Sequence, residues 1–145
     1  MSERQESAAS DFANGFNCSQ SVLCAFCEKY GLSREEALKI VCGLGGGFRC
    51  GEVCGAVSGA VIVIGLKYGH YIAGDMESKN NCNSKTKEFI SLFKEKHNSI
   101  ICRDILGIDI STDEGRELAR SKNLFRTVCV DMVKGAVSLL EDLGY

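Results

Sequence analysis

The 145-residue sequence contains no proline and no tryptophan, and it has only two histidines. Without proline, no helix loses a backbone N–H donor in its interior, so long helices are permitted along the whole chain. Neither sign of charge is in large excess, since the formal net charge is -2. That balance gives no basic face for nucleic acid and no attraction to an acidic membrane surface, so we expect neither as a partner.

Long apolar runs are missing as well. The longest apolar segment, from Ala56 to Leu66, falls short of the roughly 20 residues that cross a bilayer. The first residues, Met1 to Ser7, are polar and lack the apolar segment of a secretory signal. We therefore expect no membrane span and a cytoplasmic location. The length suits one domain over residues 1–145, with its own buried core.

Cysteine, by contrast, is abundant, with nine residues. In a reducing compartment they are not expected to form a permanent disulfide framework, and an odd count leaves at least one unpaired. Metal ligation and reversible redox chemistry are the functional interpretations. The simpler alternative is that about half of the cysteines are small buried hydrophobic residues.

Apolar residues recur at helical spacing nearly everywhere, and glycines and capping residues separate the helices. The expected caps are Asn17 or Ser19, Ser33, and Ser111 or Thr112, and the expected glycine stops are Gly15, Gly31 and Gly107. We expect an irregular polar segment from Gly69 to Asn83. The overall prediction is an all-α protein, a compact orthogonal bundle of about six to seven helices. The expected helical segments are Ser2–Ala13, Asn17 or Ser19 to Tyr30, Ser33–Val41, Glu52–Tyr68, Ser84–His97, a single turn over Ile100–Gly107, Asp113–Ser121 and Leu124–Leu143.

The chain is organised around the glycine-rich segment from Val41 to Gly69. Its first half must turn tightly, and its second half is an apolar helix in which Gly55, Gly59 and Ala60 allow close approach to another helix. Cys54 stands where the turn passes into this helix. Free backbone N–H groups and the positive helix end stabilise a thiolate, so we expect a lowered pKa at Cys54 and a redox or metal site around it.

Three further cysteines are candidates for the same site. Cys18 and Cys102 are expected at helix starts, whereas Cys129 lies on the apolar stripe of the last helix, where a buried core thiol is the simplest interpretation. Only folding could bring these residues together. Cys50 precedes Cys54 in the glycine turn and could serve as a resolving thiol or a replacement ligand.

Other features are weaker candidates. Cys24 and Cys27 have the C-x-x-C spacing, but they fall mid-helix with no strand nearby, so a redox pair there is disfavoured, and Cys42 and Cys82 are expected to have no role. Glu52 is expected to act on the helix N-terminus, with a proton acceptor for Cys54 as the alternative. The glycine turn lacks the Lys-Ser/Thr of a phosphate loop, so no nucleotide is expected. His70 and His97 have no standard zinc spacing.

Four segments in order resemble the motifs of the C_GCAxxG_C_C family of redox-active proteins, over nearly the whole chain. The segments are Gly15–Gln20, Gly45–Phe48 with Cys54–Gly59 in the C-G-A-x-x-G form, Cys102–Gly107, and Cys129. The resemblance implies that these four cysteines define the site and that the function is redox or cluster-binding. In a split-Soret type cytochrome, a related domain with four such cysteines is thought to hold an iron–sulfur centre. This chain has no C-x-x-C-H motif, so no haem is expected.

Three functions follow. In the favoured one, Cys18, Cys54, Cys102 and Cys129 bind an iron–sulfur cluster or zinc, for electron transfer or sensing. In the second, Cys54 is the attacking thiol of a thiol–disulfide oxidoreductase. In the third, the chain is a non-catalytic helical interaction module, a homodimer through its small-residue helix. No acid–base pair or nucleophile triad indicates a hydrolase or transferase, which leaves oxidoreductase as the enzyme class, with an unidentified redox partner protein.

Overall fold

The computed structural model describes residues 1–145. No strand is present; the one β-type pairing is an isolated bridge between Val53 and Ile101. The all-α class is thus confirmed, with eight helices, one of which is a short turn. They are α1 (Glu3–Ala13), α2 (Cys18–Cys24), α3 (Arg34–Ile40), α4 (Gly55–Tyr68), α5 (Met76–His97), α6 (Cys102–Leu106), α7 (Asp113–Ser121) and α8 (Val130–Asp142).

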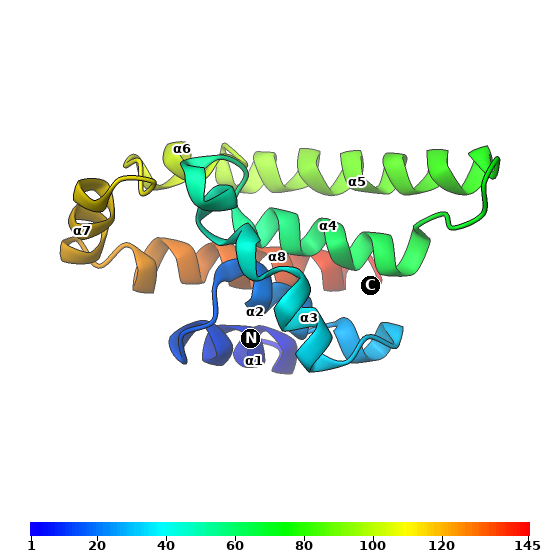
Figure 1. Cartoon of the computed structure of the whole chain (residues 1–145), viewed down its shortest axis with the longest axis horizontal. Helices are drawn as coiled ribbons and strands as arrows, with labels where there is room; N and C mark the ends of the chain where they lie inside the picture. The colour runs from blue at the N-terminus through cyan, green and yellow to red at the C-terminus, as the bar shows by residue number, and fades with distance from the viewer.

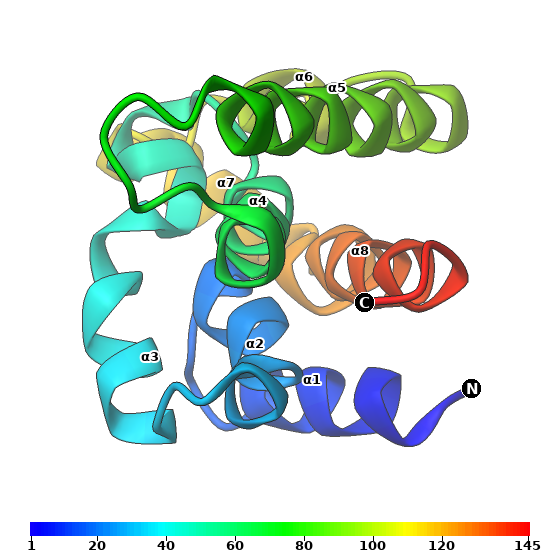
Figure 2. The same ribbon diagram turned by 90° about the vertical axis from the view of Figure 1, so that its right-hand side faces the viewer.

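The helices are arranged in layers. Helix α5 lies along the top, α4 and α8 lie in the middle, and α1 to α3 lie below (Figure 1, Figure 2). Helices α4 and α8 begin at the same end of the molecule, and α5 runs back to that end, where α6 and α7 follow (Figure 1). The starts of α4, α6 and α8 therefore meet at one end, which we call the cysteine end. None of the helices combines the length and the apolar character needed to cross a membrane.

Side-chain caps begin the helices where the sequence predicted them. Asn17, Ser33 and Thr112 each accept a hydrogen bond from the backbone N–H three residues further on. Such a cap contributes about 1 kcal/mol of helix stability. At Gly31 and Gly107 the chain leaves a helical segment in the left-handed conformation, as expected for glycine stops.

Several boundaries differ from the expectation. Helix α2 ends at Cys24, and a separate 3-10 turn covers Cys27–Tyr30. Helix α5 begins at Met76, because Asp75 accepts a hydrogen bond from the Ser78 N–H and so caps a start within the segment expected to be irregular. This first part of α5 is polar and largely exposed, so it carries no hydrophobic periodicity.

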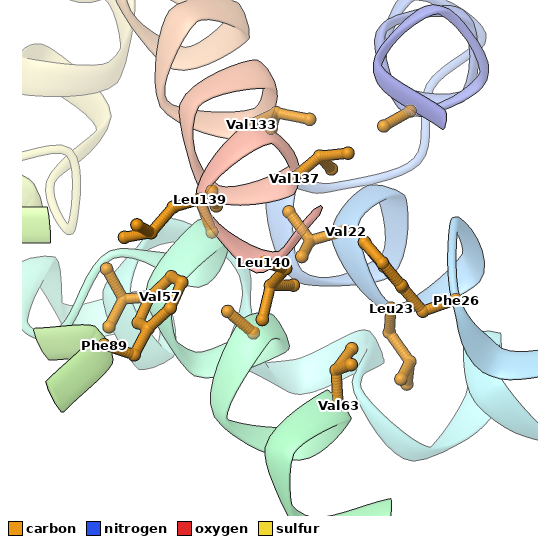
Figure 3. Packing of buried hydrophobic residues seen from close by; sticks show 14 of the residues in the cluster. Val22, Leu23, Phe26, Val57, Val63, Phe89, Val133, Val137, Leu139 and Leu140 are labelled. Atoms are coloured by element: carbon orange, nitrogen blue, oxygen red, sulfur yellow. The ribbon is translucent and has the colours of Figure 1, made fainter. Parts of the chain in front are cut away.

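The main core consists of one cluster of 22 buried residues. Apolar side chains of α2, α4 and α8 point toward one another, and Phe89 of α5 closes the cluster (Figure 3). Fully burying each large apolar side chain contributes about 1.5–3 kcal/mol. Residues that show this packing are Val22, Leu23, Phe26, Val57, Val63, Val133, Val137 and Leu140.

Two glycines of α4 permit close contact with the start of α2. A Cβ atom at Gly59 would lie 2.8 Å from the Ser19 carbonyl oxygen, and one at Gly55 would lie 2.7 Å from the Cys18 sulfur. Real Cβ atoms do not approach so closely. The expected role of Gly55 and Gly59 in helix approach is confirmed, and the G-x-x-x-G spacing places both on one face of α4.

Candidate functional site

The four candidate cysteines line one cavity of about 780 Å³ at the cysteine end. Cys18 is the first residue of α2, Cys102 is the first of α6, and Cys54 and Cys129 immediately precede α4 and α8. Cys18, Cys54 and Cys102 thus stand at helix starts, as the sequence predicted, whereas Cys129 ends a widened turn that continues into α8. Cys54 and Cys102 are buried, whereas Cys18 and Cys129 are half-buried. None of the remaining five cysteines lines this cavity.

A short backbone pairing fixes Cys54 beside Cys102. The Cys54 N–H donates to the Ile100 carbonyl at 2.7 Å, and the Cys102 N–H donates to the Glu52 carbonyl at 2.6 Å. Together they flank the Val53–Ile101 bridge. These bonds explain how two cysteines far apart in sequence come to share one wall of the cavity.

Glu52 does not cap α4, which was the role favoured for it. Its carboxylate forms an ion pair with the Arg103 guanidinium at 2.6 Å, on the exposed side of the same pairing. The residue that precedes α4 is Cys54, and this helix has no side-chain cap. Glu52 therefore links the two paired segments from outside.

The glycine turn adopts an unusual backbone. Gly46, Gly47, Phe48 and Arg49 have successive φ angles of 64°, 63°, 61° and 59°, so they form a left-handed turn. Each non-glycine residue in this conformation costs roughly 1–2 kcal/mol. A Cβ atom at Gly47 would lie 2.5 Å from the Glu52 nitrogen and 2.9 Å from the Cys102 Cβ. The turn therefore packs directly against the Cys102 wall of the cavity.

The Cys18 sulfur lies among several backbone donors. The backbone N–H groups of Gly46, Cys18, Ser19 and Gly55 lie near this sulfur, and each of them lowers the pKa of the Cys18 thiol. Burial has the larger effect, so the pKa of Cys18 is raised above its ordinary value. The starts of α2 and α4 and the glycine turn thus converge on Cys18 rather than on Cys54.

The pKa values of the other three thiols are also raised. Burial is the largest cause at each of them, and the nearby Cys18 thiol adds to it. The pKa rises to about 11 at Cys102 and to about 12 at Cys129, and it rises further at Cys54. The lowered pKa expected at Cys54 is wrong, because desolvation outweighs the one helpful backbone N–H, that of Ala56.

Cys129 is placed by a widened helical turn. Its N–H donates to the Leu124 carbonyl at 3.1 Å, five residues back, and regular α-helix begins only at Val130. Such widened turns occur often at functional sites. Cys129 packs beside the small cluster of Cys102, Leu106, Ile110 and Ala119, away from the main core. The interpretation of Cys129 as an ordinary core thiol is therefore replaced by a cavity position.

Four cysteines around one cavity are the donor set of an iron–sulfur cluster or a structural zinc site. No three His, Cys, Asp or Glu residues lie close enough together to hold a single metal ion. Tetrahedral zinc needs thiolates about 3.8 Å apart, given a Zn–S distance of about 2.3 Å. Thiolate sulfur is the usual ligand of an iron–sulfur cluster, so the donor chemistry suits that group. A single ion would require the thiols to move closer. Both metal assignments remain predictions.

The remaining cysteines lie elsewhere. Cys24 and Cys27 flank the end of α2, and the Cys27 thiol donates to the Cys24 carbonyl at 3.8 Å. Burial raises the pKa of Cys24 to about 11. The C-x-x-C pair is therefore in contact at a helix end, not in mid-helix. Cys50 is exposed, and its thiol donates to the Gly47 carbonyl at 3.4 Å, so the structure does not bring it to the cavity.

Sequence reasoning missed four arginines that line the cavity: Arg49, Arg116, Arg120 and Arg126. They come from the glycine turn, from α7 and from the widened turn before α8. Arg116 and Arg120 are four residues apart and share one face of α7. No spacing relates this pair to Arg49 or Arg126, so only the folded arrangement brings all four together.

An all-α fold with four cysteines around a single cavity defines the class of protein: a small helical thiol protein. A family model described as "Putative redox-active protein (C_GCAxxG_C_C)" matches residues 16–143. The chain belongs to this family of redox-active proteins. No curated protein and no solved structure matches the chain.

Proposed function

We propose that Cys18, Cys54, Cys102 and Cys129 form a redox centre that holds an iron–sulfur cluster for electron transfer or sensing. The observation that carries this proposal is the convergence of four cysteines from separate segments on one cavity. The thiols lie close enough for their charges to interact, since Cys18 raises the pKa values of the other three. Such a cluster, when bound, supplies one-electron redox chemistry.

The surrounding residues suit thiolate ligation. Ligands must lose their protons, and a bound cation compensates the cost of burying the resulting charge. Backbone N–H groups around Cys18 stabilise negative charge on that sulfur and tune the potential of any centre it ligates. The cavity wall is mostly hydrophobic, which limits access of water to the sulfurs.

Thiol–disulfide exchange is the second candidate, and the donors around Cys18 favour it. The Cys18 thiolate would attack a small disulfide, forming a mixed disulfide and releasing one thiolate. A second cavity cysteine would then attack Cys18, forming a protein disulfide and releasing the second thiol, so two electrons leave the protein for the small disulfide. In this scheme Cys18, with four backbone donors, is the attacking residue in place of Cys54.

The deciding experiment is strictly anaerobic purification followed by iron, zinc and acid-labile sulfide analysis with an absorption spectrum. Stoichiometric iron and sulfide with visible charge-transfer bands support the cluster. Zinc alone argues for a structural site. Absence of iron, zinc and sulfide contradicts the cluster proposal, and a redox titration of the thiols is then the next experiment. Serine at any of the four cavity cysteines should abolish the bands, while serine at Cys42 or Cys82, outside the cavity, should not.

A further inference from the structure

We propose that the cavity also binds a small anionic organic molecule, with a carboxylate or phosphate beside an apolar body, through Arg49 and Arg126. The proposal deepens the proposed function by naming the class of molecule presented to the cysteines. It rests on that function for the reaction, but not for the binding.

The charged residues of the cavity wall all have the same sign. Four arginines line the cavity, and no aspartate or glutamate does. This concentration of positive charge runs against the net charge of the whole chain, which is -2. A cavity of this kind concentrates anions at its mouth.

Two of the four arginines have no partner within the protein. Arg120 pairs with Glu117 at 2.7 Å, and Arg116 lies 3.9 Å from Asp113. Neither Arg49 nor Arg126 takes part in any of the six ion pairs or any side-chain hydrogen bond of the structure. Their guanidinium groups are therefore free to bind a carboxylate or phosphate in the two-pronged geometry that arginine favours.

The backbone holds Arg49 near the cysteines. Arg49 adopts a left-handed conformation with φ of 59°, and strain of this kind is often found at functional sites. Its Nη1 atom would lie 3.2 Å from a Cβ at Gly46, so the guanidinium reaches back over this glycine. Gly46 and Cys18 both line the cavity, and the Gly46 N–H is near enough to the Cys18 sulfur to lower the pKa of that thiol. An anion bound by Arg49 would therefore lie beside Cys18.

The size and lining of the cavity indicate the rest of the molecule. Its volume of about 780 Å³ falls in the range of small-molecule sites, roughly 300–1,000 Å³. Most of its lining is hydrophobic and includes Phe12, Phe16 and Phe125. Such a wall favours an apolar or aromatic body over a free inorganic ion.

Three probes of one shape and different charge test the proposal: 2-naphthoate, the neutral 2-naphthamide and the cationic naphthalene-2-carboxamidine. We expect naphthoate to bind about tenfold or more tightly than the amide by calorimetry, with the amidine weakest. Added salt should reduce this difference. Equal affinities for naphthoate and naphthamide, or no saturable binding of naphthoate, would overturn the proposal.

Variants assign the effect to residues. Arg49→Gln and Arg126→Gln should each weaken naphthoate binding about three- to tenfold while leaving naphthamide unchanged, and Arg49→Lys should retain part of the affinity. Lys39→Gln removes the same charge from exposed α3, so it is the matched control and should change nothing. Unchanged naphthoate affinity in Arg49→Gln and Arg126→Gln contradicts the proposal. Helical content by circular dichroism checks the fold of every variant.

A variant with serine at all four cavity cysteines separates the two proposals. Retained preference for naphthoate in this variant supports anion binding, even where metal analysis and thiol titration have failed to show a redox centre. If the wild-type protein shows no preference for naphthoate over naphthamide, the anion site alone is overturned, whatever the iron content. The size of the preference is read as a ratio of dissociation constants in each protein.

Discussion

In the main core, α2, α4, α5 and α8 contribute to a cluster of 22 buried residues, while at the cysteine end only four residues form a second cluster. The side chains of the large cluster lie between regular helices (Figure 3). The small one borders a cavity of about 780 Å³. The large cluster reaches the cavity through Cys54, with Cys18 packed against it, but most of its members do not line the cavity. Most of the apolar burial, and so most of the stability, therefore lies outside the cavity wall.

Backbone geometry also differs between the two regions, because unusual conformations are concentrated at the cysteine end. The cysteine end holds the left-handed turn at Gly46 to Arg49, the left-handed residue Asn123 and the widened turn before α8. The large core is surrounded by helices with ordinary geometry. The fold tolerates backbone strain at the cysteine end because burial in the large core supplies most of its stability. Strained backbone of this kind is common at functional sites.

Removal of a large side chain should cost more in the main core than beside the cavity. Phe26→Ala empties a site that is 1% exposed, so we expect a loss of about 3–5 kcal/mol in the free energy of unfolding. Leu106→Ala, at 8% exposure beside the cavity, should cost about 2 kcal/mol, near the low end for leucine, because neighbouring atoms already face open space. Urea unfolding followed by circular dichroism measures both, and equal losses would contradict this difference between regions.

Gly47→Ala tests the strained turn. The substitution places a Cβ at a φ of 63° and 2.5 Å from the Glu52 nitrogen, so strain and overpacking together should cost about 2–5 kcal/mol. It should also disturb the Cys102 wall and change the rate at which a thiol reagent modifies the cavity cysteines. Gly43→Ala is the control, since nothing lies within 4 Å of its added Cβ, and it should leave both measurements nearly unchanged. A harmless Gly47→Ala would show that this turn is not fixed as described.

Gly59→Ala and Gly65→Ala compare the two ends of one helix. At Gly59 the new Cβ meets the backbone of Ser19 at 2.8 Å, so α4 must move away from α2 at a cost of about 1–3 kcal/mol. At Gly65 the new Cβ meets nothing within 4 Å, and alanine should stabilise the helix by about 0.5–1 kcal/mol. Thermal unfolding gives the sign of each change. We expect Gly59→Ala to lower the unfolding temperature and Gly65→Ala to raise it. If both substitutions raise it, α2 and α4 are not in close contact at Gly59.

Local signals in the sequence predicted much of the fold. Capping by Asn17 and Thr112 and the glycine stops depend on a few neighbouring residues, so they could be recognised without the fold. The positions of Cys18 and Cys102 at helix starts follow from the same signals. The polar beginning of α5 could not be recognised, because an exposed helix has no apolar stripe to reveal it.

The chemistry of the cavity was less accessible to sequence reasoning. The raised pKa values depend on burial, which is a property of the whole fold and which reversed the effect expected from a helix start at Cys54. The backbone N–H groups that lower the pKa of Cys18 include those of Gly46 and Gly55, which only the folded chain brings to α2. Arg49 and Arg126 likewise meet only across the cavity. Non-local contacts of this kind leave no pattern along a single sequence.

The raised thiol pKa values make stability depend on pH at the cysteine end. The pKa values of Cys102 and Cys129 rise to about 11 and about 12 in the folded state, against about 8.5 in an unfolded chain. The folded state therefore holds these protons more tightly. Its stabilisation is fully present below about pH 8.5 and is lost as pH rises through the folded pKa values. In reduced, metal-free protein, the free energy of unfolding should fall steadily from pH 8 toward pH 10.5, in the range below those folded values.

A double variant, Cys102→Ala with Cys129→Ala, isolates this effect from lysines and tyrosines that titrate in the same range. The slope of unfolding free energy against pH should be shallower in the double variant, whereas Cys42→Ala, at an exposed thiol outside the cavity, should retain the full slope. Bound metal would reverse the dependence, because ligation favours thiolates and strengthens as pH rises. Identical slopes in wild type and double variant would mean that these two thiols are not desolvated as the fold implies. A slope that changes sign on loading with iron and sulfide would tie the same two residues to the proposed redox centre.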